Sequence, residues 1–109
     1  MSYQHANLAA GKWRTMPLVE QLANVGSEVG RVSRWKEKDL QACEKAFTRA
    51  LELLDLTIQD PRWQGRRKEL TRVREVLCDA MSGGSVYGSD LAGLDQYFLH
   101  FAVAARSNR

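Results

Sequence analysis

Apolar residues recur at helical spacing along most of this chain. The first stripe begins at residue 18, and its members follow one another at intervals of four, three, four and three residues: Leu18, Leu22, Val25, Val29 and Val32. An α-helix completes a turn in about 3.6 residues, so these side chains share one face of an amphipathic helix. Pro17 stands immediately before the stripe and suits the first helical position, where no backbone N–H donor is needed.

Three further stripes have the same spacing. They comprise Leu40, Cys43, Phe47, Ala50 or Leu51, Leu54 and Ile58; Leu70, Val73, Leu77 and Ala80 or Met81; and Leu91, Leu94, Phe98, Phe101 and Ala105. Asp39 before the second stripe, and Ser89 or Asp90 before the last, are residue types that cap helix N-termini. We expect Pro61 to end the second helix, "DPRWQG" to form a turn and residues 82–89 to form a loop.

These four amphipathic segments predict an all-α protein. Each helix has one apolar face that must be covered, and short connections make neighbouring helices antiparallel. The predicted fold is therefore an up-and-down antiparallel four-helix bundle, with room for a short extra N-terminal helix. Residues 1–16 show no sustained period and are expected to form a loose leader, whereas residues 17–109 form a single helical-bundle domain.

Composition narrows the function classes. With 109 residues and 44% apolar content, the chain is large enough for one core but small for an enzyme with an enclosed active site. No apolar run approaches the ~18 residues of a membrane span, and a cytoplasmic location without membrane association is expected. Only two histidines and two cysteines occur, so neither a metal site nor a cofactor is expected. Cys43 and Cys78 are predicted to be near neighbours in the core, with a reduced, inert pair as the favoured interpretation and a redox switch as the alternative.

Gly26 and Gly30 stand inside the first predicted helix. Each glycine costs about 1 kcal/mol relative to alanine in a helix, so their presence calls for a reason. Together with Ala23 and Ser33 they form a stripe of small residues that lets another helix approach closely. Packing within the bundle is the favoured interpretation, with a dimer contact and a functional cleft as alternatives.

Two polar groups are candidates for a ligand or partner patch: Asn24, Glu28 and Arg31 on the first helix, and Tyr97, His100 and Arg106 on the last. The alternative for the first group is a solvated face with a weak Glu28–Arg31 ion pair. His100 beside Tyr97 could act as an acid–base group, but a partly buried, hydrogen-bonded histidine is the favoured interpretation. No nucleophile has an activating partner nearby, so no catalytic residue is assigned.

The strongest charge cluster runs from Arg62 to Arg74, where six basic residues and one acidic residue give a local charge of +5, against +3 for the whole chain. Trp63 beside it could stack on a base. The candidate nucleic-acid surface consists of Arg66, Arg67, Arg72 and Arg74. Helical rotation spreads these residues, and Arg66 could pair with Glu52 or Asp55, so a solvated charged face is the favoured interpretation.

The strings "GSEVGR", "RALELLDLTI", "REVLCD" and "YFLHFAVAAR" resemble small prokaryotic helical-bundle proteins of the HEPN superfamily and the helical substrate-binding subunits of minimal nucleotidyltransferases. This resemblance implies a four- or five-helix bundle, often dimeric, that acts beside a nucleotidyltransferase or as a ribonuclease. The ribonuclease branch has an arginine four to six residues before a histidine on a late helix. Here His100 precedes Arg106 instead, so no catalytic residue is transferred.

The resulting expectation is a non-catalytic, prokaryotic interaction subunit. It would form a homodimer and bind a protein partner, for which the resemblance implies a nucleotidyltransferase. The alternative is an RNA-binding or RNA-cleaving HEPN-like protein that uses the basic cluster with Tyr97, His100 and Arg106.

Overall fold

The structure, a computed structural model, describes residues 11–84 and 90–107 of the chain. Within these ranges the regular elements are all helical, in agreement with the predicted all-α class. They are α2 (Leu18–Trp35), α3 (Leu40–Gln59), the short 3₁₀ helix η1 (Pro61–Arg66), α4 (Arg67–Met81) and α5 (Leu91–Ser107). The segment predicted as a simple turn is thus mainly the 3₁₀ helix η1, whose first turn begins at Pro61.

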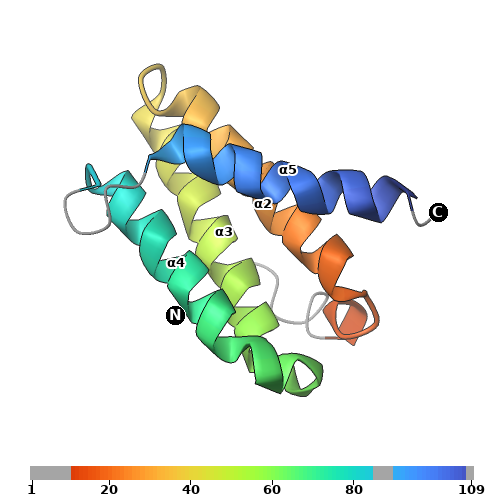
Figure 1. The fold of residues 1–109 in the computed structure, drawn as a ribbon. Coiled ribbons are helices and arrows are strands. Elements are labelled where there is room, and N and C mark those ends of the chain that lie inside the picture. The colour runs from red at the N-terminus through yellow and green to blue at the C-terminus, as the bar shows by residue number, and fades with distance from the viewer. Residues whose placement is uncertain (1–10, 85–89, 108–109) are drawn as a thin grey trace.

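The helices run up and down, but they do not pack equally. α2 and α3 form an antiparallel pair, α4 returns beside α3, and α5 runs back along α2 (Figure 1). α4 and α5 meet near the end where the chain passes from one to the other, and they diverge from there (Figure 1). α5 is therefore held mainly by α2, and its side toward α4 is only partly covered.

Side-chain caps fix the starts of α3 and α5 as the sequence predicts. The Asp39 carboxylate accepts a hydrogen bond of 3.1 Å from the backbone N–H of Ala42 at the start of α3. The Asp90 carboxylate accepts one of 2.7 Å from the backbone N–H of Gly93 at the start of α5. Each bond satisfies a backbone donor that the first turn of a helix leaves without a partner.

The core follows the predicted apolar stripes on α2, α4 and α5, but on α3 the buried face is shifted from the predicted one. Leu40 is 63% exposed, and Ala46, Ala50 and Leu53 are buried where Phe47, Leu51 and Ile58 are only partly covered. Leu22 and Val29 of α2, Leu54 of α3 and Leu70 of α4 are fully buried, and Phe98 of α5 is 2% exposed. α5 reaches the core through the small residues of α2, because Phe98 lies directly over Gly26. Gly26 therefore permits close packing inside one chain, which is the favoured one of the three interpretations.

Part of the segment predicted as a loose leader, residues 1–16, packs on the bundle through Trp13. Trp13 is only 4% exposed, and its indole Nε1–H donates a 3.1 Å hydrogen bond to the Thr57 hydroxyl on α3. Its backbone carbonyl accepts a 2.8 Å bond from Nε2 of Gln21 on α2. A single large side chain thus anchors this segment, although its sequence shows no helical period. Residues 1–10 of the predicted leader lie outside the described residues.

Candidate interaction surfaces

The first predicted polar patch is a local arrangement on α2. Arg31 forms a short ion pair with Glu28, whose other carboxylate oxygen, Oε2, lies 3.7 Å from a guanidinium nitrogen of Arg49 on α3. Among the described residues this buried Oε2 accepts no hydrogen bond. Asn24 donates a 2.8 Å bond to the backbone carbonyl of Glu20, one turn earlier. Glu28 therefore belongs to the α2–α3 contact.

The second half of the patch lies elsewhere. Gly26 faces α5, and Glu28 follows it by two residues, which is about 200° around a helix. α5 thus packs on the side of α2 that is opposite to Glu28. Tyr97 contacts α4 instead, where its hydroxyl donates a 3.3 Å bond to the Glu69 carboxylate. Consequently the structure does not bring the six predicted patch residues together.

Tyr97 of α5 is held by contacts with α4 and with its own helix. Its ring packs edge-on against Phe98 and Phe101, with centroids 5.2 and 5.3 Å away. Burial of the phenol raises the pKa of Tyr97, and the neighbouring Glu69 carboxylate raises it further. The hydroxyl is therefore a neutral hydrogen-bond donor at physiological pH. His100, in contrast, is exposed, which contradicts the predicted partly buried histidine, and Arg106 is exposed as well.

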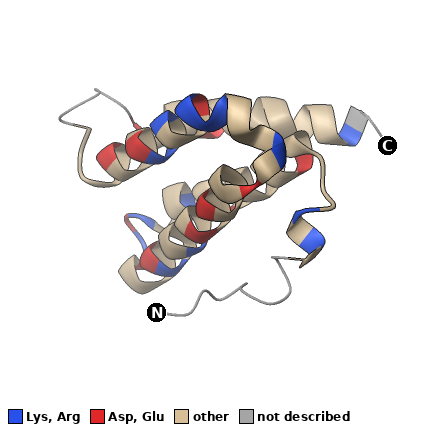
Figure 2. Ribbon diagram, turned by 90° about the horizontal axis from the view of Figure 1, so that it is seen from below, with Lys and Arg blue, Asp and Glu red and all other residues tan. Residues whose placement is uncertain are grey.

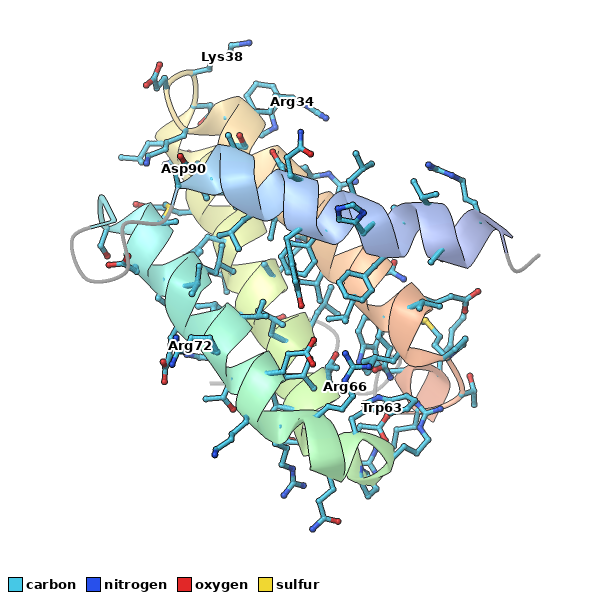
Figure 3. The ribbon with its side chains drawn as sticks, in the orientation of Figure 1. Arg34, Lys38, Trp63, Arg66, Arg72 and Asp90 are labelled. Atoms are coloured by element: carbon cyan, nitrogen blue, oxygen red, sulfur yellow. The ribbon has the colours of Figure 1, made fainter. Side chains whose placement is uncertain are left out.

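Arginines of the predicted nucleic-acid surface are engaged within the chain. Arg66 forms a bidentate ion pair with Glu69, at 2.8 to 3.1 Å, rather than with Glu52 or Asp55. Arg74 pairs with Asp55 on α3 at 2.7 Å. Arg67 donates a 3.1 Å bond to the backbone carbonyl of Ile58, and Arg72 lies 4.0 Å from Glu75. Arg66, at the end of η1, and Arg72, on α4, lie apart rather than in one cluster (Figure 3).

Trp63 is also engaged. Its indole Nε1–H donates a 2.7 Å bond to the Gln21 side chain, and the Arg62 guanidinium covers the ring at 4.5 Å. The Arg62 guanidinium therefore occupies one face of the ring, where a base would otherwise stack. Arg62 is itself held by the carboxylate of Asp60, with its Nη2 at 2.7 Å.

A buried polar network, which the sequence analysis did not identify, joins the N-terminal segment, α2 and η1. Its centre is Asp60, which is 1% exposed and accepts bonds from Arg62 and from Nε2 of Gln21. These donors, Arg62 foremost, lower the pKa of Asp60 to about 2. The only signal in the sequence is the Asp60–Pro61 pair, which is typical of a helix start. The network stabilises this end of the bundle and leaves no reactive group exposed.

The divergence of α4 and α5 opens a groove of about 520 Å³. We call it the α4–α5 groove; it is lined by Glu69, Arg72, Val73 and Val76 of α4, by Gly93, Leu94 and Tyr97 of α5, and by Asp90 just before α5. Its walls are mainly apolar, and its charged residues lie along α4 and at the start of α5 (Figure 3). The Tyr97–Glu69 hydrogen bond joins the two walls.

A second apolar surface lies on the solvent side of α5. Leu99 and Val103, one turn apart, are 52% and 48% exposed. With Ala92 and Gln96, which are also exposed, they form one row that we call the outer face of α5. Leu99 follows Tyr97 by two residues, or about 200° around the helix, so this face and the α4–α5 groove are separate surfaces.

The described residues offer no metal or membrane chemistry. Their histidine, cysteine and carboxylate side chains form no group of three or more that could hold a metal ion. None of the described helices combines the length and the apolarity that crossing a membrane requires. Cys43 is fully buried, with its pKa raised by that burial, and Cys78 is half-buried; both are free thiols. No protein-family model, curated protein or solved structure matches the chain.

Proposed function

We propose that this protein is a non-catalytic helical-bundle subunit that binds a protein partner in the α4–α5 groove. The observation that carries this proposal is the convergence of Val73, Val76, Leu94 and Tyr97 on an open groove between two diverging helices. Amphipathic helices bind in such grooves through apolar residues at intervals of three and four. A partner's helix would cover the sides of α4 and α5 that this chain leaves exposed.

The edges of the groove would set the direction of the partner's helix. Asp90 stands at one end, where one of its oxygens already caps α5 and the carboxylate remains exposed. A basic residue on the partner near Asp90 would be favoured by charge. At the other end Glu69 is already paired with Arg66 and Tyr97, so that end would accept an uncharged residue.

Engagement of the arginines also supports a protein partner over RNA. Arg66 and Arg74 each form close ion pairs with carboxylates, so binding a phosphate would require breaking them. The resemblance to nucleotidyltransferase substrate-binding subunits implies a nucleotidyltransferase as the partner. The homodimer predicted from the sequence is part of the same proposal.

The test is an affinity capture from the host lysate with tagged full-length protein, with and without nuclease, followed by direct titration of any captured protein. Val76→Asp places a charge on the groove wall, whereas Thr71→Asp places the same charge at an exposed position of α4 outside the groove lining. We expect a nuclease-resistant partner that binds the wild type and Thr71→Asp equally but binds Val76→Asp at least tenfold more weakly. Capture of no protein, or equal binding by all three, would contradict the proposal.

A further inference from the structure

A stretch of ten residues in α5 carries no charged side chain. Residues 96–105 contain no aspartate, glutamate, lysine or arginine. This stretch appears in Figure 2 as an uncharged segment reaching toward the C-terminal end of the chain. A helix without a charged face is usually buried all round. Here Phe98 and Ala105 face the core, while Leu99 and Val103 remain about half exposed.

A hollow lies beside this exposed row. Its volume is about 420 Å³, and it follows the seam between α2 and α5. Small side chains form much of its lining, with Ala23 and Ser27 from α2 and Ala102 from α5. Leu99 stands at its edge. One continuous surface therefore carries both a projecting apolar side chain and a recess bounded by small residues.

We propose that the outer face of α5 binds the same face of a second copy of this chain, with the α5 helices antiparallel and Leu99 of each copy in the hollow of the other. A two-fold interface brings one patch against itself, so the patch must contain both a projection and a recess. The α2–α5 seam meets this condition.

Charge agrees with this pairing. In an antiparallel pair centred on Leu99, Arg106 of one copy stands opposite Ala92 of the other. Asp95 follows Ala92 by three residues, which is less than one helical turn, and it lines the hollow. Arg106 is exposed, and in this register its guanidinium would approach the Asp95 carboxylate of the second copy, which in its own chain is hydrogen-bonded to Ser33 and lies near Arg34. No like charges meet along residues 96–105.

This inference rests on the homodimer part of the proposed function and adds the surface and the register. It is independent of what fills the α4–α5 groove, because that groove lies on a different side of α5. Both surfaces can therefore be occupied at the same time.

Sedimentation equilibrium over a concentration series tests the surface. We expect the wild type to have twice the monomer mass of 12.3 kDa. Leu99→Glu or Val103→Glu should weaken self-association at least tenfold, because each would bury a carboxylate against apolar atoms. Thr71→Glu on α4 is the matched control and should dimerise like the wild type. Circular dichroism verifies that the variants keep their helical content, as expected for substitutions of half-exposed side chains.

The outcomes separate the two parts of the argument. A wild type that stays monomeric overturns both the homodimer and this inference. A dimer that persists in Leu99→Glu and Val103→Glu overturns the inference and leaves the homodimer standing.

Cross-linking tests the register without adding a charge. In a Cys78→Ser background, Leu99→Cys places two thiols next to the two-fold axis, within the Cα separation of about 4–7 Å that a disulfide requires. We expect this variant to form a covalent dimer under mild oxidation. Thr71→Cys in the same background should stay monomeric on a non-reducing gel. Equal cross-linking by the two variants would contradict the antiparallel pairing at Leu99.

Discussion

Gly26 of α2 and Phe98 of α5 are in direct contact, and the contact leaves no room for a side chain at position 26. A Cβ atom added to Gly26 would lie 2.6 Å from the Cβ of Phe98 and 3.2 Å from the first ring carbon. Phe98 is almost fully buried, so its ring has little freedom to move away. This contact sets how closely α5 approaches α2, and the helical position therefore requires a glycine despite its low helix propensity.

The two glycines of α2 should respond in opposite ways to alanine. In Gly26→Ala the new methyl group overlaps Phe98, which we expect to cost about 1–3 kcal/mol of overpacking, only partly offset by the higher helix propensity of alanine. In Gly30→Ala the nearest side-chain atom is a carboxylate oxygen of Asp95 at 3.6 Å, an ordinary contact. That variant should be neutral or up to about 1 kcal/mol more stable.

Urea denaturation followed by circular dichroism measures both changes as shifts of the midpoint. The pair is its own control, because the same substitution is made one turn apart on the same helix. Equal shifts for the two variants would mean that the approach of α5 at Gly26 is not as close as described.

Most of the core could be predicted from the sequence, although Leu40 of the predicted stripe on α3 is exposed. Contacts between distant segments could not be predicted. The spacing of apolar residues predicts the burial of Leu22, Val29 and Leu54. The residue type and position of Asp39 predict the start of α3. The bond of Gln21 to Asp60 joins residues 39 positions apart, and no periodicity indicates it. The α4–α5 groove depends on the angle of α5, which is fixed by packing at Phe98 rather than by any pattern within α5 itself.

Candidate site residues were the least predictable part. Glu28 and Arg31 were correctly expected to be able to pair, but nothing in the sequence shows that Glu28 faces Arg49 on α3. The sequence predicts that Arg66 pairs with an acid of the preceding helix, but it pairs with Glu69 in the first turn of α4, three residues further along the chain. Long side chains choose among several acids within reach, and only the final positions of the backbone decide between them.

Trp13 should contribute as much to the free energy of unfolding as the core residues of the helices, although no repeating apolar pattern surrounds it. Trp13→Ala removes a buried indole and its bond to Thr57, and we expect a loss of about 3–5 kcal/mol in the free energy of unfolding. Trp35→Ala is the matched control, because Trp35 is 36% exposed and should cost much less. Urea unfolding measures both. Similar small losses would show that residues 11–16 contribute little to the fold.

Acid should destabilise the protein through Asp60. The pKa of this carboxyl is lowered from its ordinary value of 3.8 to about 2 in the folded state, chiefly by the Arg62 side chain. Because the carboxyl has a lower pKa in the folded state than in the unfolded state, its ionised form stabilises the fold. This stabilisation is complete above the unfolded-state pKa and is lost as the pH falls through the folded-state pKa. The expected contribution is about 2 kcal/mol, lost between about pH 4 and pH 2.

Asp60→Asn isolates that contribution. We expect the variant to be less stable than the wild type at pH 7, and the difference to shrink by about 2 kcal/mol at the acid end of the series. Asp39→Asn, which exchanges one good helix cap for another at an exposed position, serves as the control and should keep the pH dependence of the wild type. A constant difference between Asp60→Asn and the wild type at all pH values would exclude a role for Asp60 in acid unfolding.

RNA binding should be weak, because the basic cluster around α4 is internally paired. We expect the dissociation constant for single-stranded RNA to be no tighter than about 10⁻⁵ M at physiological salt, within the range of non-specific binding. Fluorescence anisotropy with a labelled oligonucleotide at several salt concentrations measures it, with the double variant Arg67→Gln and Arg72→Gln compared against Lys45→Gln on α3. Tight binding that falls steeply with salt and is lost only in the double variant would instead favour the RNA-binding alternative. In that case RNA phosphates would have to replace the Ile58 carbonyl as the partner of Arg67 and the Glu75 carboxylate as the partner of Arg72. The arginines would then bind RNA only after their contacts within the chain were broken.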